Sequence, residues 1–285
     1  MAEELEIKLT LGNGGEQAVL DWLAGQGGAE PGRKHLVNRY YDTPDLALNG
    51  ERAALRVRQA DTHYIQTLKT QGHFVDGAHR REEWEWPLPG PDLNLGLLAD
   101  TPVAERVNLA ALAVVFETNF DRRIQMLDSE QASVECALDI GRILAGDRHR
   151  PLAEVEFELK SGSSSALLAW AERLAQRAPL FLNLVSKAEQ GYWLAGLGTP
   201  NAEAVGDDAL TAFLRALSVH WLTGEAGDAL TRSLAGIRQD AAEEGLEVEW
   251  RWLEGALKQP AREWLFEPGL IRLQLGLLAR QVAVG

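Results

Sequence analysis

The residues best suited to chemistry in this chain are carboxylates that recur at every second position in two short stretches. Glu4 and Glu6 lie in the stretch EELEIKL, and Glu154, Glu156 and Glu158 lie in the stretch AEVEFEL, with apolar residues between them. Alternate residues of a β-strand point to the same face, so each stretch would present a row of carboxylates on one side. Carboxylate oxygens are the ligands that hard divalent cations such as Mg²⁺ and Mn²⁺ prefer.

Basic residues follow the same alternation in other stretches. LRVR places Arg56 and Arg58 on one face, QTLK contributes Lys69, and RREEWEW places Arg81 and Glu83 opposite its two tryptophans. Arginine binds phosphate oxygens as a bidentate fork, and lysine binds them as a point charge. Carboxylates on one wall and basic groups on the other would form a cradle for a metal-bound polyphosphate. A solvated sheet face is the alternative, but it leaves the sorting of the charges by sign on five strands unexplained.

The elements that must position these residues are strands. After the first stretch, a period of two recurs over residues 36–42, 53–59, 64–70, 80–87, 115–127, 132–143 and 152–160. A closed antiparallel barrel would make the inward-facing side chains of such strands converge. Residues 16–23 and 164–178 have helical spacing and could cover its apolar outer face, packing over Trp84 and Trp86. The predicted fold is therefore of the α+β class, with an eight-stranded antiparallel β tunnel and covering helices.

The pattern changes after about residue 197. Residues 198–207 are typical of a linker, and apolar residues then recur at helical spacing over 210–222, 228–244, 248–257 and 270–284. This predicts two domains, a strand-rich one over 1–197 and a small helical bundle over 208–285.

Composition narrows the class of function. A net charge of -14 argues against general binding to nucleic acid, which depends on a cationic surface. The single cysteine, Cys136, permits neither an internal disulfide nor a thiolate metal cluster. The charged N-terminus does not resemble a signal peptide, and no apolar run approaches the roughly 20 residues that cross a bilayer. We expect a cytoplasmic protein with a small-molecule partner and no membrane partner.

The order of the motifs resembles that of the triphosphate tunnel metalloenzymes, also called the CYTH superfamily. The motifs are Glu4-x-Glu6-x-Lys8, YYDTP at 40–44, LRVR at 55–58, QTLKT with Lys69, RREEWE with Arg81, FETNFDRR with Arg122, CALDIG with Asp139, EVEFEL, and SKAEQGY with Lys187. The resemblance spans roughly residues 1–197. The chain is most similar to bacterial inorganic triphosphatases that carry an appended helical domain.

The resemblance implies roles for individual residues. Glu4, Glu6, Asp139, Glu156 and Glu158 would hold Mg²⁺ or Mn²⁺, with Glu154 a weaker candidate. Lys8, Arg56, Arg58, Lys69, Arg81, Arg122 and Lys187 would bind phosphates, and Lys8 with Glu4 and Glu6 would be catalytic. Glu83 and Glu135 would order these groups from within the tunnel. The implied reaction is hydrolysis of inorganic tripolyphosphate to diphosphate and phosphate.

The helical region departs from the family pattern. In the similar triphosphatases it is usually a CHAD domain, rich in histidine and basic residues, whereas residues 200–285 contain one histidine and 8 Lys and Arg against 13 Asp and Glu. An acidic bundle would repel a polyanion, so we expect a reduced CHAD-like region that stabilises the enzyme or forms a homodimer.

Other functions stay open at this point. A nucleoside or thiamine triphosphatase or a class IV adenylyl cyclase would use the same walls. A module that binds polyphosphate or a nucleotide without turnover is a further alternative. The full set of acids favours turnover, because a pure anion binder would gain by losing them.

Overall fold

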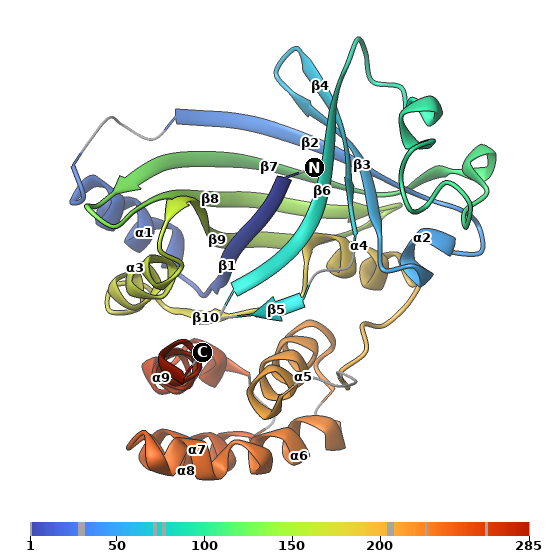
Figure 1. Ribbon diagram of the computed structural model, residues 1–285. Coiled ribbons are helices and arrows are strands. Elements are labelled where there is room, and N and C mark those ends of the chain that lie inside the picture. The colour runs from blue at the N-terminus through green and yellow to red at the C-terminus, as the bar shows by residue number, and fades with distance from the viewer. Residues whose placement is uncertain are drawn as a thin grey trace.

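The computed structural model describes residues 2–27, 32–70, 73–75, 78–203, 208–225, 227–259 and 262–284, without the side chains of residues 2–4, 73–75, 78–81 and 282–284. A strongly curved sheet forms one part of the molecule, and helices from the C-terminal third form a layer beneath it (Figure 1). The strands are β1 (Ala2–Leu11), β2 (Gly32–Asp42), β3 (Ala54–Ala60), β4 (His63–Lys69), β5 (His73–Val75), β6 (Ala78–Leu88), β7 (Ala113–Asp128), β8 (Ala132–Ala145), β9 (Arg148–Gly162) and β10 (Leu180–Leu182). The helices are α1 (Gly15–Ala24), α2 (Ala47–Gly50), α3 (Ser165–Ala175), α4 (Lys187–Ala195), α5 (Ala209–Thr223), α6 (Asp228–Gly236), α7 (Arg238–Glu243), α8 (Glu247–Ala256) and α9 (Pro268–Val284).

The described strands pair antiparallel in the order β10-β1-β9-β8-β7-β2-β3-β4-β6-β5. Strand β6 also pairs with β1, from Ala2 opposite Glu83 to Glu6 opposite His79. The pairing therefore passes through eight strands and returns to β1 (Figure 1). The α+β class and the antiparallel sheet are confirmed. The strand count differs from the predicted eight because β5 and β10 have only three residues each, which is too short for a period of two to show.

Strand β9 shows why the sequence separates its two faces. Val155 and Phe157 are fully buried beneath the covering helices, whereas Glu154, Glu156 and Glu158 point to the opposite face. Residues that lie directly opposite one another on neighbouring strands share a face. Because β1 and β8 pair with β9, their side chains are divided between the same two faces of the sheet. We call the face that bears the glutamates the polar face.

The apolar side of the sheet is covered in two places. Helices α1 and α3 pack on it through Trp22 and Trp170, whose rings meet edge to face with centroids 6.0 Å apart. Elsewhere residues 89–112, with 3₁₀ turns at Leu95–Leu98 and Leu109–Ala111, bury Leu98 against Trp84 and Trp86. The prediction that these two tryptophans lie on the apolar face is confirmed. They are partly buried, and the segment that covers them is an irregular connection rather than the predicted helices.

Helix α4 lies across one end of the polar face and was not predicted. A capping box begins it, in which the Ser186 hydroxyl accepts from the Glu189 amide and the Glu189 carboxylate accepts from the Ser186 amide. A Cβ on Gly191 would overlap the Phe116 ring of β7, so helix and strand are in direct contact. The Tyr192 hydroxyl donates to Asp42 over 2.7 Å. These contacts bring Lys187, the first residue of α4, to the polar face.

The C-terminal helices share one core with the sheet. Leu180 and Phe181 of β10 belong to the same apolar cluster as Phe213 of α5 and Leu273 of α9. The helix predicted over 228–244 is instead two helices, α6 and α7, separated at Ile237. The first of them ends at Gly236, a residue type that disfavours helix interiors. Residues 204–207 of the predicted linker lie outside the described residues. Among the described helices, none combines the length and apolarity that crossing a membrane requires.

Candidate functional site

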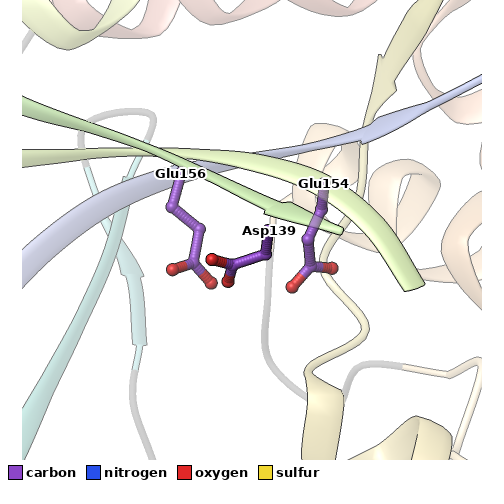
Figure 2. A group of neighbouring side chains, drawn as sticks. All are labelled: Asp139, Glu154 and Glu156. Atoms are coloured by element: carbon purple, nitrogen blue, oxygen red, sulfur yellow. The ribbon is translucent and has the colours of Figure 1, made fainter. Parts of the chain in front are cut away.

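Three carboxylates meet on the polar face of β8 and β9. Asp139, Glu154 and Glu156 each offer an oxygen within 4.8 Å of the others (Figure 2). Lys187 Nζ lies 2.9 Å from Asp139 Oδ2 and 2.7 Å from Glu156 Oε1, and it also contacts Glu154. Arg122 of β7 donates to both Asp139 oxygens, over 2.7 and 2.6 Å, and to Glu156 over 2.5 Å. We call these five residues the inner cluster.

The contacts of the inner cluster favour the charged states of Lys187 and Glu156. Burial by itself would lower the pKa of Lys187, but Asp139, Glu154 and Glu156 raise that pKa above its usual value. Burial would likewise raise the pKa of Glu156, whereas Lys187 and Arg122 hold it well below its usual range. Because Asp139 is fully buried and Glu154 is 1% exposed, these ion pairs lie in a region of low dielectric constant.

Lys8 of β1 joins the edge of the inner cluster. It lies opposite Glu156 in the register between β1 and β9, and its ammonium group donates to the carbonyl of Val185. Burial lowers the pKa of Lys8, and Glu154 opposes that effect. Lys8 is therefore the least stably charged of the buried lysines in the described part of the site.

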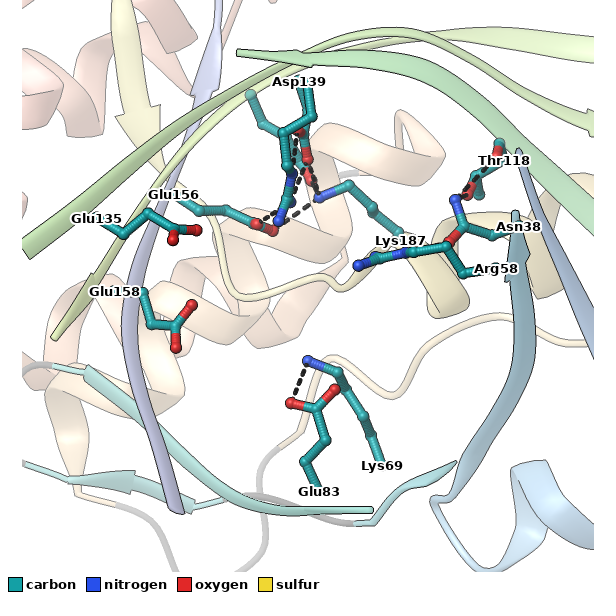
Figure 3. A network of polar contacts seen from close by, with 12 residues as sticks. Asn38, Arg58, Lys69, Glu83, Thr118, Glu135, Asp139, Glu156, Glu158 and Lys187 are labelled. Atoms are coloured by element: carbon teal, nitrogen blue, oxygen red, sulfur yellow. Dashed lines mark hydrogen bonds and ion pairs between the residues drawn. The ribbon is translucent and has the colours of Figure 1, made fainter. Parts of the chain in front are cut away.

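Two arginines of β3 line the polar face across from the glutamates. Arg58 donates to Asn38 Oδ1 over 2.8 Å, and Asn38 in turn donates to Thr118 over 3.1 Å (Figure 3). Burial, followed by the neighbouring charges of Arg56 and Arg122, lowers the pKa of Arg58 to about 9. Its guanidinium therefore lies where further negative charge would be favourable.

Lys69 of β4 and Glu83 of β6 lie beside these arginines. The Lys69 ammonium is 3.1 Å from Glu83 (Figure 3). Glu83 is also 3.9 Å from Arg56. Burial would raise the pKa of Tyr40, but Arg56 and its neighbours lower it overall, which is further evidence of positive potential here. The Tyr40 ring stacks on Phe116 with centroids 4.6 Å apart. We call Arg56, Arg58 and Lys69 the basic wall.

Three further carboxylates lie at one level across adjacent strands. Glu6 of β1 is opposite Glu158 of β9, and Glu158 is opposite Glu135 of β8. Lys160 lies 2.7 Å from Glu158 and 3.6 Å from Glu135. Like charges directly opposite one another on neighbouring strands are destabilising unless cations offset them. We call Glu6, Glu135 and Glu158 the outer row, and Figure 3 shows Glu135 and Glu158 pointing into the same central space as Glu156.

The two groups of carboxylates differ in their suitability for a divalent cation. In the inner cluster an ammonium and a guanidinium already contact the oxygens of Asp139 and Glu156. The outer row brings three carboxylates to one level, a donor set that fits Mg²⁺ or Mn²⁺. The residues therefore supply the carboxylate oxygens that a hard cation takes. The inner cluster holds its three carboxylates within 4.8 Å of one another but already contacts two cations, whereas Glu158 and Glu135 of the outer row contact Lys160.

Most of the predicted site residues come together on the polar face. Those whose side chains the structure describes there are Glu6, Lys8, Arg56, Arg58, Lys69, Glu83, Arg122, Glu135, Asp139, Glu154, Glu156, Glu158 and Lys187. The Cα atoms of Glu4 and Arg81 are partners in the register between β1 and β6, but both side chains lie outside the described residues.

Sequence reasoning missed several polar residues of the site. Lys160 continues the alternation of Glu154, Glu156 and Glu158, so its spacing could have revealed it. Asn38 and Thr118 carry no charge, and the hydrogen bonds from Arg58 to Asn38 and from Asn38 to Thr118 join three strands that meet only in the fold.

A family model identifies the class of protein that this fold and site define. The CYTH domain model matches residues 2–192. The chain belongs to the CYTH family.

Among known proteins the chain is similar to the inorganic triphosphatase of Haemophilus influenzae, with 35% identity over 196 residues. The match covers 68% of this chain and 55% of the relative, so the chain spans about half of that protein's length. A solved structure of a Hippeastrum protein, described as having a dominant triphosphatase activity, matches with a TM-score of 0.52 and 18% identity. That match covers 67% of this chain and 95% of the other, and at this identity it shows a shared fold.

Proposed function

We propose that this chain is a metal-dependent triphosphatase that hydrolyses inorganic tripolyphosphate to diphosphate and phosphate inside a tunnel enclosed by the eight strands. The observation that carries the proposal is that Arg58 and Lys69 of the basic wall and Glu135 and Glu158 of the outer row lie around one central space (Figure 3). The lowered pKa of Arg58 supports an anionic ligand, because a polyphosphate beside Arg58 would offset its repulsion from Arg56 and Arg122. The 35% identity to an inorganic triphosphatase supports the same substrate class.

The basic residues divide the work of holding the substrate. Arg56 and Arg58 would each grip a phosphate with paired N–H donors, and Lys69 would add a point charge beside them. Arg122 is held by two hydrogen bonds to Asp139, so its position would change little when substrate enters. Hydrolysis breaks the bond between the terminal phosphorus and its bridging oxygen, and these fixed positive charges would stabilise the negative charge that develops on the departing diphosphate.

The outer row would hold the metal, with Glu4 and Glu156 as neighbouring candidates. A bound Mg²⁺ or Mn²⁺ would supply charge neutralisation and orientation for a phosphate and a water molecule. Lys160 would share the outer row with the metal, and its pairs with Glu158 and Glu135 keep those two carboxylates turned toward the same point. Lys8 lies two residues after Glu6 on β1, and it would contact the phosphates that lie next to the inner cluster.

Phosphate release tests this proposal directly. Purified protein is given tripolyphosphate, ATP or thiamine triphosphate, with Mg²⁺, with Mn²⁺, or with a chelator in excess. We expect metal-dependent release that is fastest from tripolyphosphate. Faster release from ATP or thiamine triphosphate would reassign the substrate, and cyclic AMP from ATP would indicate a cyclase. If no triphosphate is hydrolysed but tripolyphosphate still binds, the chain is a binding module.

We also infer a cytoplasmic location. The described helices include none that could span a membrane. Fractionation of the source cells tests this inference, which predicts that the protein is recovered in the soluble fraction rather than with membranes.

A further inference from the structure

Residues 182–189 run from the end of β10 into the first turn of α4 and are held from two sides. We call them segment 182–189. On the side of the C-terminal helices, the Gln274 amide of α9 bonds both the N–H and the carbonyl of Leu182, each over 2.9 Å. Two residues later the Leu184 N–H donates to the Ser218 hydroxyl of α5, also over 2.9 Å. Gln274 and Ser218 are fully buried, so water cannot bond the backbone groups that they contact. The two side chains satisfy these backbone groups in place of water.

The intervening residues of the segment bind β1. The Asn183 N–H donates to the Lys8 carbonyl over 3.1 Å, and the Asn183 amide donates to Thr10 Oγ1 over 2.8 Å. Val185 accepts the ammonium of Lys8 on its carbonyl. Successive residues of the segment therefore bond alternately to the helical region and to β1, the strand that carries Lys8.

A third side chain of the helical region reaches the start of α4. Arg215 of α5 donates to Glu189 over 2.5 Å, and Glu189 also accepts from the Ser186 amide over 2.8 Å. Glu189 thus links α5 to the capping box that precedes Lys187. Figure 1 shows α5 lying beneath β10 and α4, which is the arrangement these contacts require.

We propose that helices α5 and α9 position the two buried lysines of the site, and that Arg215, Ser218 and Gln274 are positioning residues that act through segment 182–189. The inference rests on the proposed function, in which Lys8 contacts the phosphates and Lys187 holds the inner cluster beside them. Lys187 contacts three carboxylates at once, and a displacement of its helix by about 1 Å would lengthen these contacts and disturb the neighbouring phosphate sites.

The Arg215→Ala substitution tests the proposal in the full-length protein. The first readout is the ¹H–¹⁵N signal of the Lys187 ammonium, assigned by its loss in Lys187→Met. The second is kcat/KM for tripolyphosphate, and the third is the thermal midpoint. Arg215→Lys serves as the conservative variant. Arg232→Ala is the matched control, since Arg232 makes a similar pair with Glu203 over 2.5 Å, also in the C-terminal region, but both side chains are more than 60% exposed.

We expect Arg215→Ala to shift or broaden the Lys187 signal and to lower kcat/KM about tenfold, with partial recovery in Arg215→Lys and no change in Arg232→Ala. A lower thermal midpoint with an unchanged Lys187 signal and unchanged kcat/KM would overturn the proposal. If the native protein hydrolyses no triphosphate, the proposed function fails, and the Lys187 signal alone decides this inference. Should Arg215→Ala not fold, Glu189→Gln is measured by the same criteria.

Discussion

Replacing Asp139 by asparagine distinguishes two roles that a carboxylate of this site could have, which are neutralising buried cations and binding a metal. Asp139 accepts two hydrogen bonds from Arg122 and contacts Lys187 at 2.9 Å while fully buried. We expect Asp139→Asn to destabilise the fold strongly and to leave Mn²⁺ binding close to that of the native protein. The reason is that Asp139 neutralises buried cations, whereas the metal site that we propose is the outer row.

The expected loss of stability follows from these contacts. An amide keeps an acceptor oxygen but loses the negative charge, which leaves two buried cations partly uncompensated. Loss of charge-assisted contacts at such a site costs about 3 kcal/mol. For a chain of this length that corresponds to a fall of about 5 °C in the melting temperature. Asp121→Asn is the matched control, because Asp121 also pairs with an arginine, Arg33, over 2.6 Å but is one-third exposed, so its loss costs at most about 1 kcal/mol.

Two measurements decide the matter. Thermal unfolding gives the stability of each variant, and calorimetric titration with Mn²⁺ gives its metal affinity, with Glu158→Gln as the variant expected to lose metal binding while it keeps its fold. The reasoning is refuted if Asp139→Asn melts like the native protein and no longer binds Mn²⁺, because Asp139 would then be a metal ligand rather than a partner of Arg122 and Lys187.

Three further predictions concern other parts of the site. Arg58→Ala should raise KM for tripolyphosphate at least about tenfold in steady-state assays, because a bidentate phosphate contact is lost, whereas Arg39→Ala, which breaks a surface pair with Glu117, should not. Because the pKa of Glu156 is lowered in the folded protein, its contribution to stability is complete above the unfolded pKa of about 4.5 and is lost as the pH falls below that value. The difference in stability between the native protein and Glu156→Gln, measured by urea titration, should therefore shrink between pH 6 and about pH 3. Growth of that difference would contradict the assignment. Gly191→Ala should destabilise the fold by about 1–3 kcal/mol in urea unfolding because its methyl group would overlap Phe116, and an unchanged midpoint would show that α4 can move away from β7.

The alternation in the sequence was sufficient to predict which residues share the polar face. A period of two needs no knowledge of the partners of a strand, so the spacing of Glu154, Glu156 and Glu158 is enough by itself to assign them to one face. Helix α4 was not predicted although its capping box, Ser186 to Glu189, is visible in the sequence. Its buried positions include Lys187, Gln190 and Gly191, so this short helix lacks the apolar periodicity that marks the longer ones.

The division of the acids between two roles that we propose could not be predicted in the same way. Glu156 and Glu158 are two residues apart on one strand and share a face. They differ in their cross-strand neighbours: Glu156 lies opposite Lys8, whereas Glu158 lies between Glu6 and Glu135. This difference is set by the register between three strands, which no local pattern in any one of them specifies. The sequence alone therefore grouped Asp139 with the metal ligands, and the contacts with Arg122 and Lys187 became visible only in the structure.

The acidic character of the helical region agrees with a positioning role rather than with binding of a polyanion. Two of the three groups that reach segment 182–189, Ser218 and Gln274, are uncharged, and the third, Arg215, is paired with Glu189. None of these contacts needs a surplus of positive charge on the helices. A region that binds polyphosphate must remain basic, but a region that holds Lys187 in place needs only buried hydrogen bonds and a shared apolar core, and α5 and α9 provide both.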